Sequence, residues 1–122
     1  VMKRKFDLNE RLINFAVAVI DISESLPKTF AGNHIAGQLV RSGTSPALNY
    51  GEAQSAESRN DFIHKMKISA KELRETFNCL KIIQKKSWHP EEKALPVLNE
   101  NNQLISIFVK SIETAKKNNT AK

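Results

Sequence analysis

The sequence predicts an all-α protein, an antiparallel up-and-down left-handed four-helix bundle that forms one domain over residues 1–122. Apolar residues recur at alternating spacings of four and three in each of four segments, which keeps one seam of every helix facing its neighbours. The alternation of apolar and polar residues that marks strands is missing. A chain of 122 residues is also long enough for one core and too short for two comfortable domains.

The first helix is predicted over about residues 8–26. Asp7 is a good N-cap, Glu10 follows at the right distance to reach back to free backbone donors, and Pro27 stops the helix. A second apolar row beside the seam widens the buried face, so we expect this helix to be buried on more than one side. The seam is Leu8, Leu12, Phe15, Val19, Ile22 and Leu26. The second row is Ile13, Val17 and Ile20.

The second helix is predicted over about residues 33–57, beginning at Asn33, and its small residues allow helix axes to approach closely. Pro46 removes a backbone donor from the middle of this helix, so a kink is expected there. The alternative is a break into two helices. Asn49 falls on the buried seam, and we expect its amide to be hydrogen-bonded and to fix the register of packing rather than to bind a ligand.

The third and fourth helices are predicted over about residues 59–86 and 91–117. Ser58 with Asp61 caps the third, and Pro90 followed by Glu91 and Glu92 suits the start of the fourth. A disordered tail, KKNNTAK, is expected at the end of the chain. The third seam is Ile63, Met66, Ala70, Leu73, Phe77 and Leu80. The fourth is Leu98, Asn101, Ile105, Phe108, Ile112 and Ala115, in which Asn101 is a second buried amide.

The sequence gives little support to catalysis, metal binding or membrane insertion. Asp61-x-x-His64 is a single copy of a spacing that a carboxylate-bridged metal centre needs twice, and Cys79 has no partner for a disulfide or a zinc site. No glycine loop for phosphates or nucleophile elbow is present. We therefore expect a non-enzymatic protein without metal or cofactor. No apolar run is long enough to span a bilayer, so we expect it in the cytoplasm.

A row of cationic residues on the third helix is the strongest functional signal. The formal net charge of +6 favours an anionic partner. On another face of this helix than the seam, five basic residues follow one line without a carboxylate, over about 27 Å at 1.5 Å per residue, which suits contacts to phosphates. The alternative is an ordinary solvated, lysine-rich face. Trp88 and Tyr50 are the only plausible aromatics for base stacking, so binding should be directed at the backbone. The five residues are Lys67, Lys71, Arg74, Lys81 and Lys85.

The apolar rows exceed what four seams need. The second row on the first helix, the small-residue rows on the second, and Leu48 on an otherwise polar face predict burial against another copy of the chain. We therefore expect a homo-oligomer. A different interpretation of the same rows is a scaffold that docks a partner protein.

The segment QLVRSGTSPALNYGEAQ followed by DFIHKMKISAKELRET resembles the four-helix-bundle proteins encoded in intervening sequences of bacterial 23S ribosomal RNA genes. The similarity extends over nearly the whole chain. It depends on Arg41-Ser42, on Asn49 to Glu52, on Phe62 with Lys65, and on Ala70 to Leu73 with Glu72. Many relatives read Asn-Ile-Ala-Glu-Gly where this chain has Asn-Tyr-Gly-Glu-Ala over residues 49–53, so the glycine is displaced.

This resemblance implies a bundle assembled into a ring-shaped homopentamer that associates with RNA, and it adds Arg41 to the candidate nucleic-acid-binding residues. A related branch, the accessory variability proteins of diversity-generating retroelements, has a similar bundle with a basic ring that works with a reverse transcriptase. The residues do not separate the two branches. An adjacent reverse transcriptase gene would favour the second, and a position inside a ribosomal RNA operon would favour the first.

Overall fold

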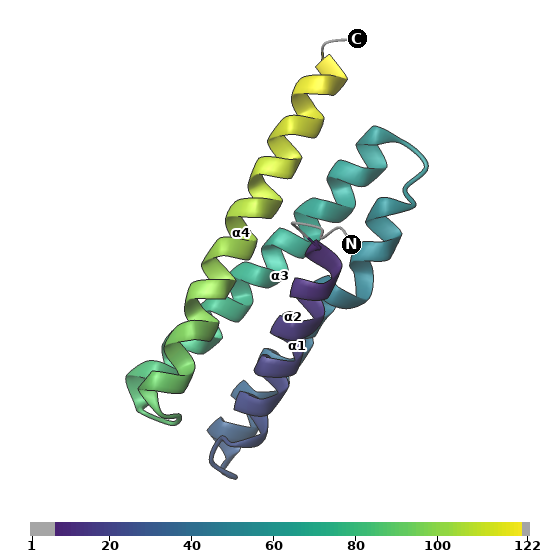
Figure 1. The fold of residues 1–122 in the computed structure, drawn as a ribbon. Helices are drawn as coiled ribbons and strands as arrows, with labels where there is room; N and C mark the ends of the chain where they lie inside the picture. Colours follow the sequence, from purple (N-terminus) through teal and green to yellow (C-terminus); the bar gives the residue numbers. More distant parts are fainter. Residues whose placement is uncertain (1–6, 121–122) are drawn as a thin grey trace, which may run out of the picture.

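The computed structural model describes residues 7–120, and this part of the chain forms four α-helices without a strand. They are α1 (Leu8–Glu24), α2 (Phe30–Gln54), α3 (Arg59–Lys86) and α4 (Glu91–Thr120). Figure 1 shows them side by side, with the chain turning back at each connection. Each helix packs against the next in sequence, and α4 closes the bundle with a lighter contact to α1. The predicted all-α four-helix bundle is confirmed, and its left-handed twist stays a prediction.

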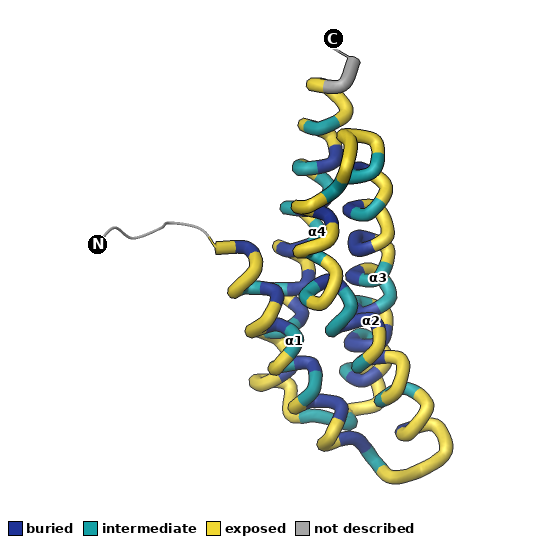
Figure 2. Tube along the Cα trace, turned by 90° about the vertical axis from the view of Figure 1, so that its right-hand side faces the viewer, coloured by how far each residue is buried: buried dark blue, intermediate teal, exposed yellow. Residues whose placement is uncertain are grey.

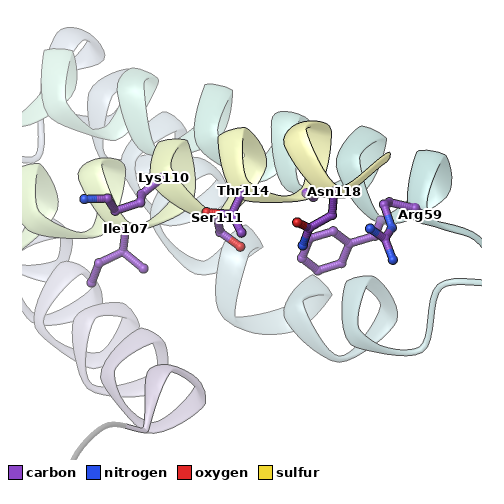
Figure 3. Close-up of a pocket in the computed structure, with 8 residues that line it drawn as sticks. Arg59, Ile107, Lys110, Ser111, Thr114 and Asn118 are labelled. Atoms are coloured by element: carbon purple, nitrogen blue, oxygen red, sulfur yellow. The ribbon is translucent and has the colours of Figure 1, made fainter. Parts of the chain in front are cut away.

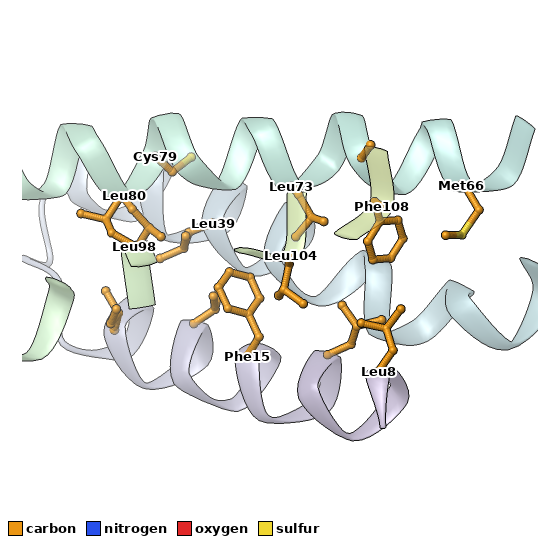
Figure 4. Close-up of a cluster of buried hydrophobic side chains, with 14 of the residues drawn as sticks. Leu8, Phe15, Leu39, Met66, Leu73, Cys79, Leu80, Leu98, Leu104 and Phe108 are labelled. Atoms are coloured by element: carbon orange, nitrogen blue, oxygen red, sulfur yellow. The ribbon is translucent and has the colours of Figure 1, made fainter. Parts of the chain in front are cut away.

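The buried residues, dark blue along the tube in Figure 2, lie on the sides of the helices that face one another. The seams predicted for α1 and α3 form most of this core, in which Leu12, Val19 and Leu73 are almost completely buried. In Figure 4, Leu39 from α2 and Leu104 with Phe108 from α4 meet these side chains in the centre of the bundle. The spacing of four and three therefore predicted the core correctly on the helices with large apolar residues.

The starts of α1 and α3 follow from their capping residues. The backbone N–H of Glu10 donates to Asp7 Oδ1 at 3.1 Å, and that of Asp61 donates to Ser58 Oγ at 3.0 Å. By contrast, α2 begins three residues before the predicted Asn33, because Thr29 Oγ1 accepts from the N–H of Gly32. Gly32 is therefore not a break between helices but part of the first turn. A β-carbon there would lie 2.0 Å from the carbonyl oxygen of Pro27, so only glycine fits.

Helix α2 runs through Pro46 without a break, so the alternative of two helices is wrong. Gly43 on the same helix sits directly against α1, where a β-carbon would lie 2.6 Å from Cγ1 of the buried Val19. The hydroxyls of Ser42 and Thr76 share a buried hydrogen bond of 2.8 Å between α2 and α3. The small residues of α2 thus allow the close packing that the sequence predicted.

Three predictions about burial and order are wrong. Asn49 is exposed and donates to Ser45 Oγ of its own helix, because the next residue, Tyr50, packs inward on Phe108 at this turn of α2. Ile13 and Val17 are exposed as well, since α1 packs only on α2 and lightly on α4 and leaves its outer side uncovered. Part of the tail predicted to be disordered belongs to α4, which continues to Thr120, and residues 121 and 122 lie outside the described part.

The turn between α3 and α4 is fixed by a left-handed serine. Ser87 has φ 56°, its N–H donates to the carbonyl of Gln84, and the N–H of Trp88 donates to that of Ile83, as in a Schellman motif. His89 Nδ1 lies 2.7 Å from Ser25 Oγ at the end of α1. Because the Ser25 hydroxyl also donates to the carbonyl of Ile22, its oxygen accepts from His89. Burial and the nearby Lys93 lower the pKa of His89.

Asn101 of α4 is completely buried in the core, as the sequence predicted. Its Nδ2 donates to the carbonyl of Leu73 on α3 at 3.1 Å, while its Oδ1 has no hydrogen-bond partner among the described residues. An amide between two apolar seams can bond in only one relative position of the helices. The bond to Leu73 agrees with the predicted role of Asn101 in fixing the register between α3 and α4, and that role stays a prediction.

Candidate nucleic-acid interface

The cationic row on α3 lies on the outer side of the bundle. Lys67, Lys71, Arg74 and Lys85 are exposed, and Lys81 between them is half-buried. The spacing that places Ile63, Met66 and Leu73 in the core turns these residues away from it, because positions three and four apart share one face of a helix. We call Lys67, Lys71, Arg74 and Lys85 the outer row.

The members of the outer row have no hydrogen-bond or ion-pair partner among the described residues. Lys81 differs, because its Nζ donates to Gln84 Oε1 at 3.0 Å. Cations that no carboxylate neutralises keep their full attraction for phosphates, and each phosphate they bind releases counterions. The arrangement can therefore bind an extended polyanion along the helix.

Arg41 is not part of this row. Its guanidinium lies between α2 and α3, where it donates to Glu75 and, at 2.9 Å, to Glu72 Oε1. These bonds to Glu75 and Glu72 raise the pKa of Arg41. Gln38 completes the set by accepting from the same side chain at 3.1 Å. We call Arg41 with Glu72 and Glu75 the α2–α3 clamp, and its effect is to neutralise two carboxylates that flank the outer row.

The start of α3 carries a second ion pair. Lys65 Nζ donates to Asp61 Oδ1 at 3.2 Å, and this bond lowers the pKa of Asp61. His64, next to this pair, is exposed at the end of the cationic line. Both carboxylates of the clamp and Asp61 thus have basic partners, so no unpaired acid of α3 stands beside the outer row.

The two aromatic residues considered for base stacking are both engaged within the chain. Tyr50 packs on Phe108 with ring centroids 6.2 Å apart, and Lys86 Nζ lies 5.9 Å from the ring centre of Trp88. Neither ring belongs to the outer row. The geometry favours contacts to the sugar-phosphate backbone over stacking on bases.

A groove at the other side of α3 is a feature that the sequence did not reveal. It lies between the start of α3 and the last turns of α4, has a volume of about 780 Å³, and is shown in Figure 3. Phe62, Ile107 and Ala115 form its apolar floor, and Arg59 and Lys110 stand at its edges. Helical spacing could mark each of these as a seam or surface residue, but only the packed bundle shows that no helix covers them.

Other chemistry has little support in the structure. Among residues 7–118, no group of three or more histidine, cysteine, aspartate or glutamate side chains could hold a metal ion. Cys79 is buried, which raises the pKa of its thiol. None of the described helices is long and apolar enough to cross a membrane.

Comparisons with known proteins agree with the fold. One solved structure, a protein of unknown function from the S23 ribosomal protein family of Bacteroides thetaiotaomicron, superposes with a TM-score of 0.79 at 28% sequence identity. The alignment covers 87% of this chain and 98% of that one. A search of curated proteins finds no match. The family model described as "23S rRNA-intervening sequence protein" matches residues 4–110, and the chain therefore belongs to the 23S rRNA-intervening sequence protein family.

Proposed function

We propose that this protein is a non-enzymatic, oligomeric RNA-binding protein that holds phosphates along the outer row of α3. The observation that carries the proposal is the set of four exposed cations that have no partner among residues 7–120, namely Lys67, Lys71, Arg74 and Lys85. The family name supports RNA, and ribosomal RNA in particular, over DNA. Lys81 belongs to the same line once its bond to Gln84 opens.

In this proposal Arg41 supports binding indirectly. The α2–α3 clamp neutralises Glu72 and Glu75, which would otherwise repel phosphates beside the outer row. This accounts for the presence of Arg41 and Glu72 together among the residues that mark the resemblance. The prediction that Arg41 itself contacts nucleic acid becomes a testable alternative.

The test is the dependence of RNA affinity on salt. Each phosphate contact contributes a slope of about 0.7 to 0.9 in a plot of log affinity against log salt. The double variant Lys71→Glu/Arg74→Glu should lose affinity and about 1.5 units of slope, because two contacts are removed. The measurement is a titration of labelled single-stranded and duplex RNA at several salt concentrations.

The control is a variant with the same net charge and an intact outer row. Lys93 and Lys116 are exposed on α4 and are not members of the outer row, so Lys93→Glu/Lys116→Glu changes the net charge equally. This variant should retain most of the slope. An equal loss in both variants, or a flat salt dependence of the wild type, would contradict the proposal.

We also propose that the protein is a homo-oligomer, and the resemblance to pentameric relatives gives five as the subunit number. The exposed apolar side chains Ile13, Val17 and Leu48 support this, because single chains rarely leave such rows in water. Light scattering at micromolar concentration should give a mass well above that of one chain. A monomer mass would contradict the proposal.

A further inference from the structure

The groove beside Phe62 lies along the last turns of α4, beyond the start of α1. On α4, Glu100 and Gln103 bind Arg11 of α1, and the same row continues as Ile107, Ser111, Thr114 and Asn118. Because α1 begins only at Leu8, this continuation extends past its start, as Figure 1 shows. Among residues 7–120, no segment covers on the last turns of α4 the face that α1 covers lower in the bundle.

The chemistry of the groove is apolar in the middle and cationic at the edges. The half-buried Phe62, Ile107 and Ala115 form the floor. Neither Arg59 nor Lys110 at the edges has an ion-pair partner within the described part of the chain, although Glu113 lies beside Lys110 on the outer surface. A helix with an apolar row bounded by carboxylates would match this surface.

The outer side of α1 has that pattern. Ile13 is 43% exposed and Val17 is 53% exposed, and they lie in one row with Glu10 and Glu24 at its two ends. The single base of α1, Arg11, is on another side, where it binds Glu100 at 2.7 Å. In a protein with a net charge of +6, α1 is thus an acidic helix with an uncovered apolar row.

We propose that the outer side of α1 from a second copy of the chain fills this groove, with Ile13 beside Ile107, Val17 farther along the floor, and the carboxylates Glu10 and Glu24 toward Lys110 and Arg59 at its two ends. The inference rests on the proposed oligomer and names its contact surface. The two surfaces are unlike, so the contact can be repeated from copy to copy around a ring.

Length and charge favour this occupant. The groove follows α4 from Ile107 to Asn118, about 17 Å, and Glu10 to Glu24 span about 21 Å of α1 at 1.5 Å per residue. The segment before Asp7, VMKRKF, is a poor alternative, because Lys3, Arg4 and Lys5 have the same sign as the edges of the groove. A second copy supplies both the apolar row and the opposite charge.

Charge exchange tests the contact. Arg59→Glu/Lys110→Glu makes the groove acidic, and Glu10→Lys/Glu24→Lys makes the outer side of α1 basic. Each double variant should raise the dissociation constant of the oligomer by about tenfold or more, because like charges then meet across the interface. The variant carrying all four changes should regain the wild-type mass in light scattering.

The outcomes distinguish a failure of the proposed oligomer from a failure of this interface alone. A monomeric wild type overturns the oligomer and its interface together. An oligomer that withstands both double variants, or that the four-change variant does not restore, overturns this interface alone. Lys93→Glu/Lys116→Glu is the matched control and should leave the mass unchanged, and circular dichroism verifies that every variant is folded.

Disulfide crosslinking gives an independent test. Oxidation of an equimolar mixture of Ile13→Cys and Ile107→Cys chains, mixed from monomers, should give covalent pairs, whereas each variant alone should not. The wild type reports any crosslink through Cys79, which is buried. Absence of the mixed pair, or a crosslink in one variant alone, overturns the proposed contact.

Discussion

The two sides of α3 differ in whether their polar groups have partners within the described part of the chain. On the inner side, toward α2 and α4, buried polar groups are paired: Thr76 bonds Ser42, and the carbonyl of Leu73 accepts from Asn101. On the outer side, the cations of the outer row have no partner among the described residues. The difference indicates that a polar group with a hydrogen-bond partner in the chain contributes to packing, whereas an exposed cation without one is a candidate for the proposed binding of RNA.

The largest effect is expected at Asn101, on the inner side. Asn101→Asp places a carboxylate where the amide is completely buried and where its Nδ2 bonds the carbonyl of Leu73. Burying that charge should cost about 3 kcal/mol or more at neutral pH. The buried carboxyl has a raised pKa, so the loss is small below its unfolded pKa of about 4 and grows as pH rises. Urea unfolding at several pH values measures this.

Asn101→Leu is the control for that prediction. Leucine has a similar size, and it removes the Oδ1 atom that has no partner, so the free energy of unfolding should change little. A loss as large as that of the aspartate variant would mean that the amide itself, through a group outside this chain, supplies the stability.

Comparison of sequence and structure shows where spacing was sufficient. The large apolar seams of α1 and α3 and the buried Asn101 followed from periodicity alone, because a helix turns its residues in a fixed order. The prediction that Asn49 is buried was wrong because a row of small residues on α2 does not define which side faces the core. The clamp around Arg41 and the groove beside Phe62 depend on where separate helices end and meet, which no single segment encodes.

The next effect concerns the hydroxyl pair between α2 and α3. Thr76 and Ser42 are both completely buried, and Thr76→Val leaves the Ser42 hydroxyl without this partner. The expected loss of unfolding free energy is about 1 to 2 kcal/mol. Adding Ser42→Ala should recover part of it, since both polar groups are then gone. Losses that simply add would show that the pair contributes no coupling.

A smaller effect, of opposite sign, is expected at the end of α3. Ser87 adopts the left-handed conformation with φ 56°, which glycine adopts without a steric penalty. Ser87→Gly should therefore stabilise the protein by about 0.5 to 1 kcal/mol, measured by thermal or urea unfolding. RNA affinity should not change, because the outer row stays intact. A parallel rise in affinity would show that stability, and not charge, limits binding.

The smallest effect separates a direct from an indirect role of Arg41. Arg41→Gln frees Glu72 and Glu75 beside the outer row, so RNA affinity should fall modestly through repulsion. Adding Glu72→Gln and Glu75→Gln removes both carboxylates, and affinity should return to at least the wild-type value. If Arg41 itself bound a phosphate, this triple variant would stay weak and lose about 0.7 to 0.9 of the salt slope. Titration of the same RNA at several salt concentrations distinguishes an indirect role of Arg41, through its two carboxylates, from a direct contact to a phosphate.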